Sequence, residues 1–452
     1  MASDRIIPSR AYIQGVLSLT LLGLFSAGML LRIEPFASYY YAFAWWPFIV
    51  FLDALVLALQ GHSLLSRNPR EFLVLSAMSV PLWLVFEGWN VALQNWYYAG
   101  VHQSWLARRA LGIICFATVL PAIFEATELV GALGIVREVH VRPIRVSAGL
   151  YAVPWLIGIL FLASPLLFPK YSFPLIWLGF IFILEPFNHR WARGSLLREW
   201  EQGSMTMFVR LLIGGLICGF AWEMFNIEAL TKWIYTVPFF EDLKLFEMPL
   251  AGFLGFPPFA VECYVIVQFV GIFRGGKGWE PGYESPLKQP PLGKPLRWVL
   301  ILLVAAGCLG VFQMMDWHTN NSLLPRVKDL RSLAPEEVSR LQRAGIDRLD
   351  LWIRRPEKFR PALEESGLST QAIERWECLA ALASLKQMGT GNARMLNEVG
   401  IQSTEDLAKR DPYLLAERMR AVHDRTGWGR QAPRDAQVRV WVKAARKIQA
   451  IR

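Results

Sequence analysis

The segment Phe86-Glu87-Gly88-Trp89-Asn90, followed by Trp96-Tyr97-Tyr98, decides the fold because the chain contains it twice. It returns as Trp222-Glu223-Met224-Phe225-Asn226, followed by Trp233-Ile234-Tyr235. Both copies lie in apolar runs that are long enough to cross a bilayer. Burying a carboxylate in hydrocarbon is costly, so an acid that recurs at this depth indicates a function. The pattern therefore predicts a duplicated membrane unit.

Further matches extend the repeat in both directions. Downstream, Pro121–Glu125 is matched by Pro258–Glu262. The upstream polar positions Asp53, His62 and Ser63–Arg67 correspond to Glu185, His189 and Ser195–Arg198. We therefore expect repeated segments at about 39–135 and 172–273. Counting one preceding helix, each unit has four helices, and an even number gives the two units the same orientation, as a parallel repeat.

Composition also indicates a polytopic membrane protein. The 452 residues are 54% hydrophobic and include 19 Trp and 28 Phe, and the cysteines show neither a disulfide framework nor CxxC metal spacing. The first apolar run is not followed by a small-residue cleavage site, so we interpret it as a retained helix. Runs of spanning length occur at about 11–31, 39–59, 72–95, 110–135, 146–168, 172–188, 207–230, 249–273 and 296–315.

Basic residues in the connecting loops predict the orientation. With the N-terminus in the cytoplasm, most loop Lys and Arg fall on the cytoplasmic side, which is the usual bias. These loop residues include Arg137, Arg142, Arg145, Arg190, Arg193 and Arg198. The same bias accounts for the excess of 47 Lys and Arg over 37 Asp and Glu. We expect a multi-pass protein of a bacterial inner membrane, whose nine spans leave the C-terminal part in the periplasm.

The sequence changes character after residue 320. Amphipathic patterns separated by turn residues replace the long apolar runs, and Leu341–Ile346 is echoed by Leu396–Ile401. The predicted fold class is therefore all-α. A membrane helix bundle with two parallel repeat units occupies 1–320, and a small soluble helical domain occupies 321–452.

Four glutamates, Glu87, Glu125, Glu223 and Glu262, are the candidate catalytic residues. A carboxylic acid held away from water beside an isoprenoid chain is able to act as a general acid. Two alternatives stay open: the acids form hydrogen bonds between helices and lock the units together, or they line a proton or ion path. Glu185 and His189 are spaced i, i+4 and could ligate an ion. Helical di-iron sites, however, use Glu-x-x-His on two helices, and no such motif lies in a predicted span, so we expect no metal. We expect no cofactor.

Neighbouring residues supply a candidate ligand pocket. Each of Glu87 and Glu223 shares a helix face with an asparagine side chain three residues later. Aromatic residues that lie deep in the predicted spans flank both pairs. The expected substrate-binding residues are Asn90, Asn226, Trp89, Phe86, Trp222 and Phe225. Nearer the cytoplasmic face, a second polar layer is expected from Asp53, His62, Glu185 and His189. Packing in the core is the alternative explanation for the aromatic residues.

At these residues the chain resembles the integral-membrane carotenoid cyclases of the bacterial and fungal lycopene cyclase type. That family repeats an aromatic-x-x-Trp-Asp motif, a Trp-x-aromatic motif and, after a loop, a Pro-x-Glu-Glu motif. Phe86–Asn90 and Trp222–Asn226 resemble the first motif, with Asn in place of Asp. Pro121–Glu125 and Pro258–Glu262 resemble the last. The resemblance implies acid-initiated, redox-neutral cyclisation or isomerisation of an isoprenoid, with no obligatory metal.

The C-terminal part resembles a bacterial helix-hairpin-helix-like domain family of unknown function, with Gly389-Thr390-Gly391 at the position of the hairpin glycines. In DNA-binding relatives, such a turn lets backbone amides approach phosphate. The predicted topology places this domain away from the chromosome, so we expect a protein partner or self-association rather than nucleic acid.

Together these patterns predict a membrane-embedded enzyme that acts on a lipid or isoprenoid through paired glutamic acids. The alternative is a non-enzymatic membrane protein. It would form a small-solute or proton pathway, or a scaffold that displays the C-terminal domain.

Overall fold

The computed structural model describes residues 9–237, 243–279, 292–329, 335–343, 345–354, 356–365 and 369–451. The described chain is predominantly helical, as expected. Within it, nine helical segments are long and apolar enough to cross a membrane, which confirms the predicted number for these residues. They are Ser9–Leu30, Phe36–Gln60, Pro69–Leu93, Trp105–Ala132, Gly149–Leu167, Pro169–Trp191, Thr206–Ile227, Leu250–Phe273 and Lys294–His318.

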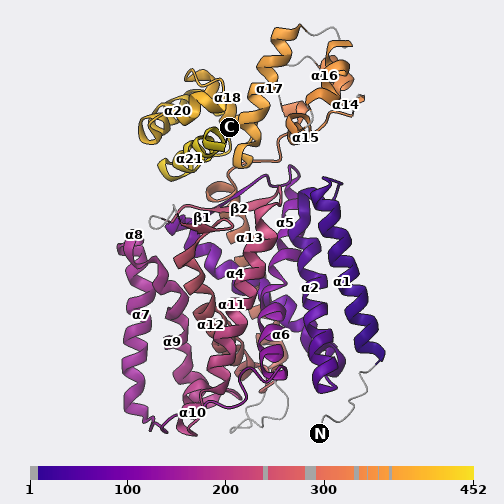
Figure 1. Cartoon of the computed structure of the whole chain (residues 1–452). Coiled ribbons are helices and arrows are strands. Elements are labelled where there is room, and N and C mark those ends of the chain that lie inside the picture. Colours follow the sequence, from indigo (N-terminus) through magenta and orange to yellow (C-terminus); the bar gives the residue numbers. More distant parts are fainter. Residues whose placement is uncertain are drawn as a thin grey trace.

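The apolar helices form one bundle with a similar helix pair at each edge (Figure 1). Helix α1 (Ser9–Leu30) packs along α2 (Phe36–Gln60), and α7 (Ala152–Leu167) packs along α9 (Ile176–Trp191). Between them lie α4 (Pro69–Leu93), α6 (Val119–Ala132), α11 (Thr206–Ile227) and α12 (Phe256–Phe273), while α13 (Lys294–His318) packs on α4. The pairs α1–α2 and α7–α9 thus occupy corresponding places, although the superposition of the two predicted units stays a prediction.

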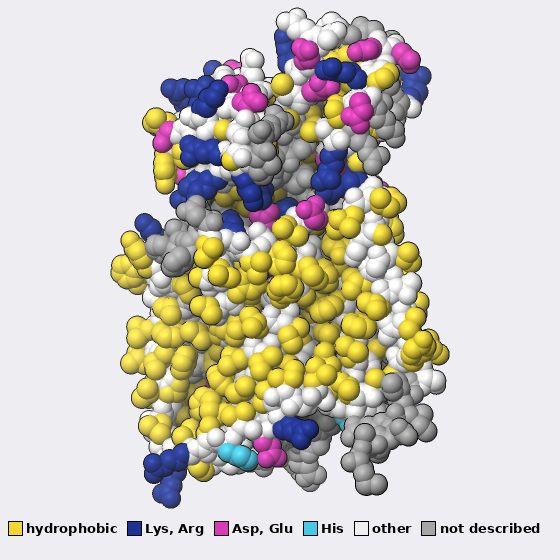
Figure 2. Space-filling view, viewed as in Figure 1, with side chains coloured by type: hydrophobic (Ala, Val, Ile, Leu, Met, Phe, Trp, Pro, Cys, Tyr) yellow, Lys and Arg dark blue, Asp and Glu magenta, His cyan; other side chains and the backbone are white. Residues whose placement is uncertain are grey.

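Hydrophobic side chains cover the outside of this bundle. Figure 2 shows them as a broad belt, with charged side chains above and below it. On the outer helices α1, α7 and α13, Leu17, Leu160 and Leu303 each expose more than half of their surface. Soluble proteins rarely expose apolar area on this scale, so the belt is compatible with a multi-pass membrane protein.

Several of the expected spans are not single continuous α-helices. The run at 110–135 forms α5 (Trp105–Phe116) and then α6, and the run at 249–273 forms the short helix η3 (Leu250–Gly255) and then α12. Pro121 lies in the first turn of α6, and α12 begins with Phe256-Pro257-Pro258. Proline is well placed at a helix start because the first turn needs no N–H donor. Hydropathy predicted continuous spans because it does not register these breaks.

A two-stranded ribbon joins the two halves at one end of the bundle, and the sequence did not predict it. Strand β1 (Trp96–Ala99) follows α4, and β2 (Lys232–Tyr235) follows α11. They pair antiparallel, with Trp96 opposite Tyr235 and Tyr98 opposite Trp233. Because side chains alternate between the faces of a strand, these four aromatic side chains share one face. The pairing is symmetric, since each strand contributes a Trp-x-Tyr pattern and the Trp of each strand lies opposite the Tyr of the other.

The connection to the C-terminal part extends this ribbon. After α13, residues 319–324 run parallel to 98–101, with Tyr98 N donating to Thr319 O at 2.8 Å and Asn321 N donating to Tyr98 O at 2.8 Å. On the far face of the ribbon, Tyr97 and Ile234 form a small core with Val440. The C-terminal part therefore rests on the ribbon, at the opposite end of the bundle from the start of α1 (Figure 1).

The C-terminal part has a helical core of its own, around Trp352 and Trp441. Its two echoed turns have the same structure. Ile346 N donates to Leu341 O at 2.8 Å and Ile401 N donates to Leu396 O at 2.9 Å. The helices are α14 (Pro335–Arg343), α15 (Leu349–Arg354), α16 (Pro356–Glu365), α17 (Thr370–Ser384), α18 (Thr390–Glu398), α19 (Thr404–Ala408), α20 (Pro412–Thr426) and α21 (Asp435–Ile451).

Short elements complete the described chain. They are α3 (Leu64–Arg67), η1 (Ala148–Tyr151), α8 (Pro169–Ser172), η2 (Phe173–Leu175), α10 (Leu196–Glu201), β3 (Lys244–Leu245), β4 (Met248–Pro249), η4 (Val327–Asp329) and η5 (Leu385–Gln387). Strands β3 and β4 form a tight hairpin with Glu247 between them.

Candidate functional site

Glu87 lies near the end of α4, where the ribbon closes over the bundle. Its Oε1 accepts hydrogen bonds from Trp83 Nε1 at 2.9 Å, Trp96 Nε1 at 3.1 Å and the Tyr98 hydroxyl at 2.5 Å. Its Oε2 is buried and has no hydrogen-bond partner among the described residues. One oxygen of the carboxyl group thus organises three aromatic side chains.

Glu223 holds the corresponding position on α11. Its Oε1 accepts a hydrogen bond from the Tyr235 hydroxyl at 2.8 Å, and that hydroxyl in turn accepts one from Trp233 Nε1 at 2.9 Å. Its Oε2 is also buried, with no partner in the described part of the chain. Each half therefore supplies a glutamate that holds a tyrosine of the ribbon.

The two tyrosines stay protonated in this setting. Burial, reinforced by the neighbouring Glu87, raises the pKa of Tyr98 well above its ordinary value. Burial and Glu223 do the same to the pKa of Tyr235. Both phenols are therefore neutral hydrogen-bond donors near neutral pH.

Asn90 and Asn226 hold the backbone of the ribbon. Asn90 Nδ2 donates to Trp96 O at 2.9 Å, and its Oδ1 accepts from Trp96 N at 3.2 Å. Asn226 makes the same pair of bonds with Trp233, at 3.0 and 3.1 Å. An amide suits both positions because it donates and accepts at once, whereas an ionised carboxylate only accepts. These side chains were predicted to bind substrate, and the structure uses them to position β1 and β2.

The second polar layer caps short helices at the other end of the bundle. Asp53 accepts hydrogen bonds from the Ser63 hydroxyl and from the backbone N–H of Leu65, both at 2.9 Å. Glu185 accepts the corresponding two bonds from the Ser195 hydroxyl at 2.6 Å and from the backbone N–H of Leu197 at 3.0 Å. Both carboxyl groups therefore take part in local folding, away from the ribbon.

The two histidines of that layer pair with separate partners. His62 Nδ1 lies 3.1 Å from Arg67 Nη1. His189 lies 2.6 Å from the Tyr151 hydroxyl and 2.7 Å from Glu201, and its hydrogen bond lowers the pKa of that glutamate. Within the described ranges, no three His, Cys, Asp or Glu side chains are grouped as a metal ion would require.

Glu125 and Glu262 are not brought to the ribbon. Both carboxyl oxygens of Glu125 are buried without a hydrogen-bond partner among the described residues, and its charged neighbours are Asp53, Glu128 and Arg67. Glu262 accepts one hydrogen bond, from Phe180 N at 2.9 Å. The four glutamates therefore form a ribbon pair, Glu87 and Glu223, and two separate buried acids.

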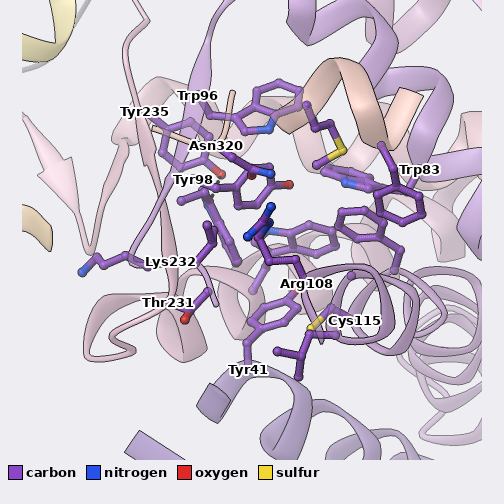
Figure 3. A pocket seen from close by; sticks show the side chains of 18 of the residues that line it. Tyr41, Trp83, Trp96, Tyr98, Arg108, Cys115, Thr231, Lys232, Tyr235 and Asn320 are labelled. Atoms are coloured by element: carbon purple, nitrogen blue, oxygen red, sulfur yellow. Dashed lines mark hydrogen bonds between the residues drawn. The ribbon is translucent and has the colours of Figure 1, made fainter. Parts of the chain in front are cut away.

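A cavity of about 180 Å³ lies on the aromatic face of the ribbon (Figure 3). Its wall consists largely of aromatic rings, and the described residues that line it include no Asp or Glu. The rings belong to Tyr41, Trp83, Trp96, Tyr98, Phe116, Trp177, Trp222, Trp233, Tyr235, Phe256, Phe259 and Phe312. Glu87 and Glu223 reach the cavity only through the side chains that they hold.

Of the aromatic residues expected to bind substrate, Trp222 lines the cavity. Phe86 stacks on Trp177 with 4.9 Å between ring centroids and so supports the wall from behind. Phe225 packs among the rings of α2, and Trp89 does not line the cavity. Helical periodicity shows on which face of a helix a residue lies, but it does not distinguish a ring that lines a cavity from a ring packed behind the cavity wall.

Three basic side chains at the cavity were missed by sequence reasoning: Arg108, Arg109 and Lys232. The first two stand at the start of an apolar run, where basic residues usually mark a membrane boundary. The third precedes the Trp-x-Tyr motif of β2. A signal for Arg108 and Arg109 was available in the sequence, because the predicted orientation places both at the outer end of their span, where basic residues are not expected.

The turn at Gly389-Thr390-Gly391 is closed by the chain itself. A Cβ atom at Gly389 would lie 2.8 Å from Ser322 Cβ, and one at Gly391 would lie 2.6 Å from Gly429 N. These contacts pack the turn closely against Ser322 and Gly429. A protein partner of the C-terminal part, and the expectation that it does not bind nucleic acid, stay predictions.

Comparison with known proteins assigns only the C-terminal part. Residues 331–448 match a family described as a domain of unknown function, DUF4332. This agrees with the expected C-terminal domain. No curated protein and no solved structure matches the chain. The resemblance of the bundle to carotenoid cyclases therefore stays a prediction.

Proposed function

We propose that the protein is an integral membrane protein whose aromatic cavity binds an isoprenoid or another lipid chain. The observation that carries this proposal is a cavity walled by aromatic rings from both halves of an apolar helix bundle. Such walls suit an apolar, unsaturated chain, because ligand sites are mostly apolar and aromatic with few polar groups. The orientation that we propose places the cavity and the C-terminal part at the periplasmic side.

The size of the cavity fits part of a lipid. At roughly 10–15 Å³ for each water-sized site, about 180 Å³ holds roughly a dozen such sites. A short isoprenoid, or a stretch of a longer chain, is of this order. A water-filled pathway would need polar side chains at intervals through the bundle, whereas the lining rings are apolar.

Gly255 offers a direct test of occupancy. It lines the cavity, and a Cβ atom there would meet only Trp177, at 3.8 Å. Gly255→Leu should therefore fill space without displacing backbone. We expect protein purified in mild detergent to carry a co-purifying lipid that is reduced at least several-fold in this variant, measured by extraction and mass spectrometry.

Gly307→Leu is the matched control. Gly307 lies on exposed α13, and a Cβ atom added there would have no atom within 4 Å, so the same change adds apolar surface away from the cavity. The lipid content of this variant should equal that of the parent protein. Equal loss in both variants, or no bound lipid in any, would remove the support for a lipid site.

An enzymatic role is the second candidate, favoured by the two Tyr–Glu pairs that meet at this one cavity. For this relay, Glu87 would carry its proton on the oxygen that faces Tyr98, and the tyrosine hydroxyl would turn from Glu87 toward the ligand. The proton of Glu87 would pass to Tyr98 while the tyrosine proton passes to a double bond of the ligand, and the reverse transfers would follow. This is redox-neutral and agrees with the isomerisation or cyclisation expected from the sequence. The aromatic wall would stabilise a carbocation through its π faces.

Substitution separates binding from turnover. Glu87→Gln keeps an oxygen acceptor for the three donors and removes the transferable proton. If the relay operates, turnover of the co-purifying lipid should fall roughly 100- to 10,000-fold while the bound amount stays unchanged. Unchanged conversion would exclude this relay and leave the binding role intact.

A further inference from the structure

Three arginines converge on one carboxylate at the cavity. Asp316, near the end of α13, accepts hydrogen bonds from Arg108 at 3.1 and 3.2 Å, from Arg109 at 2.7 Å and from Arg430 at 3.2 Å. It also accepts one from Asn320 at 2.7 Å. Arg108, Arg109 and Asn320 line the cavity, and Figure 3 shows Arg108 among its labelled rings.

Asp316 does not neutralise this cluster. Three guanidinium groups against one carboxylate leave two positive charges. Its two oxygens already accept five hydrogen bonds, whereas a carboxylate has about four lone-pair positions. Burial, followed by repulsion from Arg108, lowers the pKa of Arg430, as expected where positive charge is in excess. Buried charge that lacks a partner is costly, so the cluster favours a second anion.

Arg109 has hydrogen-bonding capacity to spare. The side chain is 6% exposed, and its Cζ lies 5.1 Å from the ring centroid of Trp105 and 5.3 Å from that of Phe312. Within the described residues, only its Nη2 makes hydrogen bonds, to Asp316 and Gln313. Its Nε is buried with no partner among the described residues. Arg108 differs, because its Nη1 also donates to the carbonyl groups of His102 and Gln103, at 2.8 Å each. Arg108 is thus fixed by the fold, and Arg109 is the group left to bind a ligand.

The other cation at the cavity shares its counter-ion. Lys232 Nζ lies 3.0 Å from Glu247, which also binds Lys386 at 2.6 Å, and it donates to Ile227 O at 2.6 Å. Two lysines against one carboxylate leave one positive charge, whereas the three arginines leave two, so the larger excess lies on the arginine side of the cavity. An anion there would be held by charge-assisted hydrogen bonds, and planar guanidinium groups suit phosphate and carboxylate.

We infer that the ligand is an amphipathic lipid with an anionic head group, a phosphate or carboxylate, which Arg109 binds while the chain occupies the aromatic cavity. The inference rests on the proposed lipid site and specifies its ligand class. Aromatic rings bind the chain and the arginine cluster selects the head group. A neutral prenyl alcohol has the chain but not the charge, and inorganic phosphate has the charge but not the chain.

The test measures binding of farnesyl phosphate, farnesol and inorganic phosphate to the full chain in detergent, by quenching of tryptophan fluorescence and by equilibrium dialysis. Loss of one charge-assisted contact, of roughly 1.5–3 kcal/mol, corresponds to roughly 10- to 100-fold in affinity. We therefore expect farnesyl phosphate to bind at least about 10-fold more tightly than farnesol. Arg109→Gln should remove that preference, and Arg109→Lys should restore part of it.

Arg297→Gln is the matched control, because it removes one positive charge from exposed α13 near the end remote from Asp316. It should keep the parent preference. Equal binding of farnesol and farnesyl phosphate, with no effect of Arg109→Gln, would overturn the head-group inference and leave the lipid site standing. If neither prenyl compound binds, the proposed function fails as well. Inorganic phosphate binding as tightly as farnesyl phosphate would make this a site for free phosphate and would overturn the inference.

Discussion

At the scale of single residues, the site depends on side chains that use a donor and an acceptor at once. Asn90 and Asn226 each act as a clamp that binds both the backbone N–H and the backbone C=O of one residue of the ribbon, and nearby glutamates each hold a tyrosine. The sequence showed that these residues recur at the same spacing. It did not show that their polar groups face protein backbone rather than ligand, because that depends on strands that form only when both halves meet.

Asn90→Asp tests the clamp. The substitution removes the donor to Trp96 O and places an acid in a buried position, which should destabilise the protein by roughly 1–3 kcal/mol. Thermal unfolding in detergent measures this. Gln94→Glu is the control. Gln94 is half-buried, and within the described residues its side-chain amide makes a single, long hydrogen bond, to Val91 O at 3.5 Å. Similar melting temperatures for both variants would show that the clamp contributes little.

The contact between the C-terminal part and the ribbon should be sensitive to acid, because Glu247 pairs with Lys386 of the C-terminal part and with Lys232 of the ribbon. Burial alone would raise its pKa, but Lys232 and Lys386 outweigh burial and lower the pKa to about 2. Because the folded-state pKa lies below the ordinary 4.5, the stabilisation is complete above about pH 4.5 and is lost as the pH falls toward 2.

Release of the C-terminal part by a protease active in acid should therefore accelerate as the pH falls from about 4.5 to about 2. Glu247→Gln should show faster release already at about pH 4.5 and a smaller change across that interval. The same acid profile in the parent and the variant would assign the acid response to other carboxyl groups.

At the scale of elements, hydropathy predicted the helices well and missed the ribbon. Apolar runs of spanning length need no partner to be recognised. By contrast, Trp96–Ala99 and Lys232–Tyr235 are short strands that pair across a long stretch of sequence. The breaks after α5 and before α12 were missed for a related reason, since proline is compatible with a helix start and with a kink. The cavity lies where these unpredicted features meet, so its lining could not be read from periodicity.

Gly100 is a position where the ribbon requires glycine. Its φ is +65°, and an added Cβ would lie 2.5 Å from Leu230 O, a backbone atom of the other half. Gly100→Ala should thus be destabilising beyond the usual cost of a positive φ, by at least about 1 kcal/mol.

Gly61→Ala supplies the comparison, because Gly61 has a φ of +80° with no atom within 4 Å of the added carbon. The difference between the two melting temperatures isolates the close contact of Gly100 with the backbone of Leu230. Equal melting temperatures would mean that the ribbon adapts without strain.

At the scale of the whole molecule, the sequence anticipated one apolar bundle, a separate helical C-terminal part and a correspondence between two halves. Corresponding contacts at Glu87 and Glu223, at both asparagines and at both helix caps support the last point. The docking of the C-terminal part was not anticipated, because its contacts, such as Lys386 with Glu247, join residues that no local pattern relates.

Topology is tested by a reporter fused after the last residue. With the N-terminus in the cytoplasm and nine spans, a reporter enzyme active only in the periplasm should be active in this fusion. A reporter active only in the cytoplasm would reverse the proposed orientation or change the number of spans.

The central claim is that a lipid chain occupies the aromatic cavity. Its most direct test is photo-crosslinking with a farnesyl phosphate analogue that carries a diazirine in the chain, followed by peptide mapping. We expect the analogue to label two segments that line the cavity: α5, and η3 together with the start of α12. In the Gly255→Leu variant, the labelling of both segments should fall. Labelling confined to the outward faces of α1, α7 and α13, unchanged by that substitution, would contradict a lipid in the cavity.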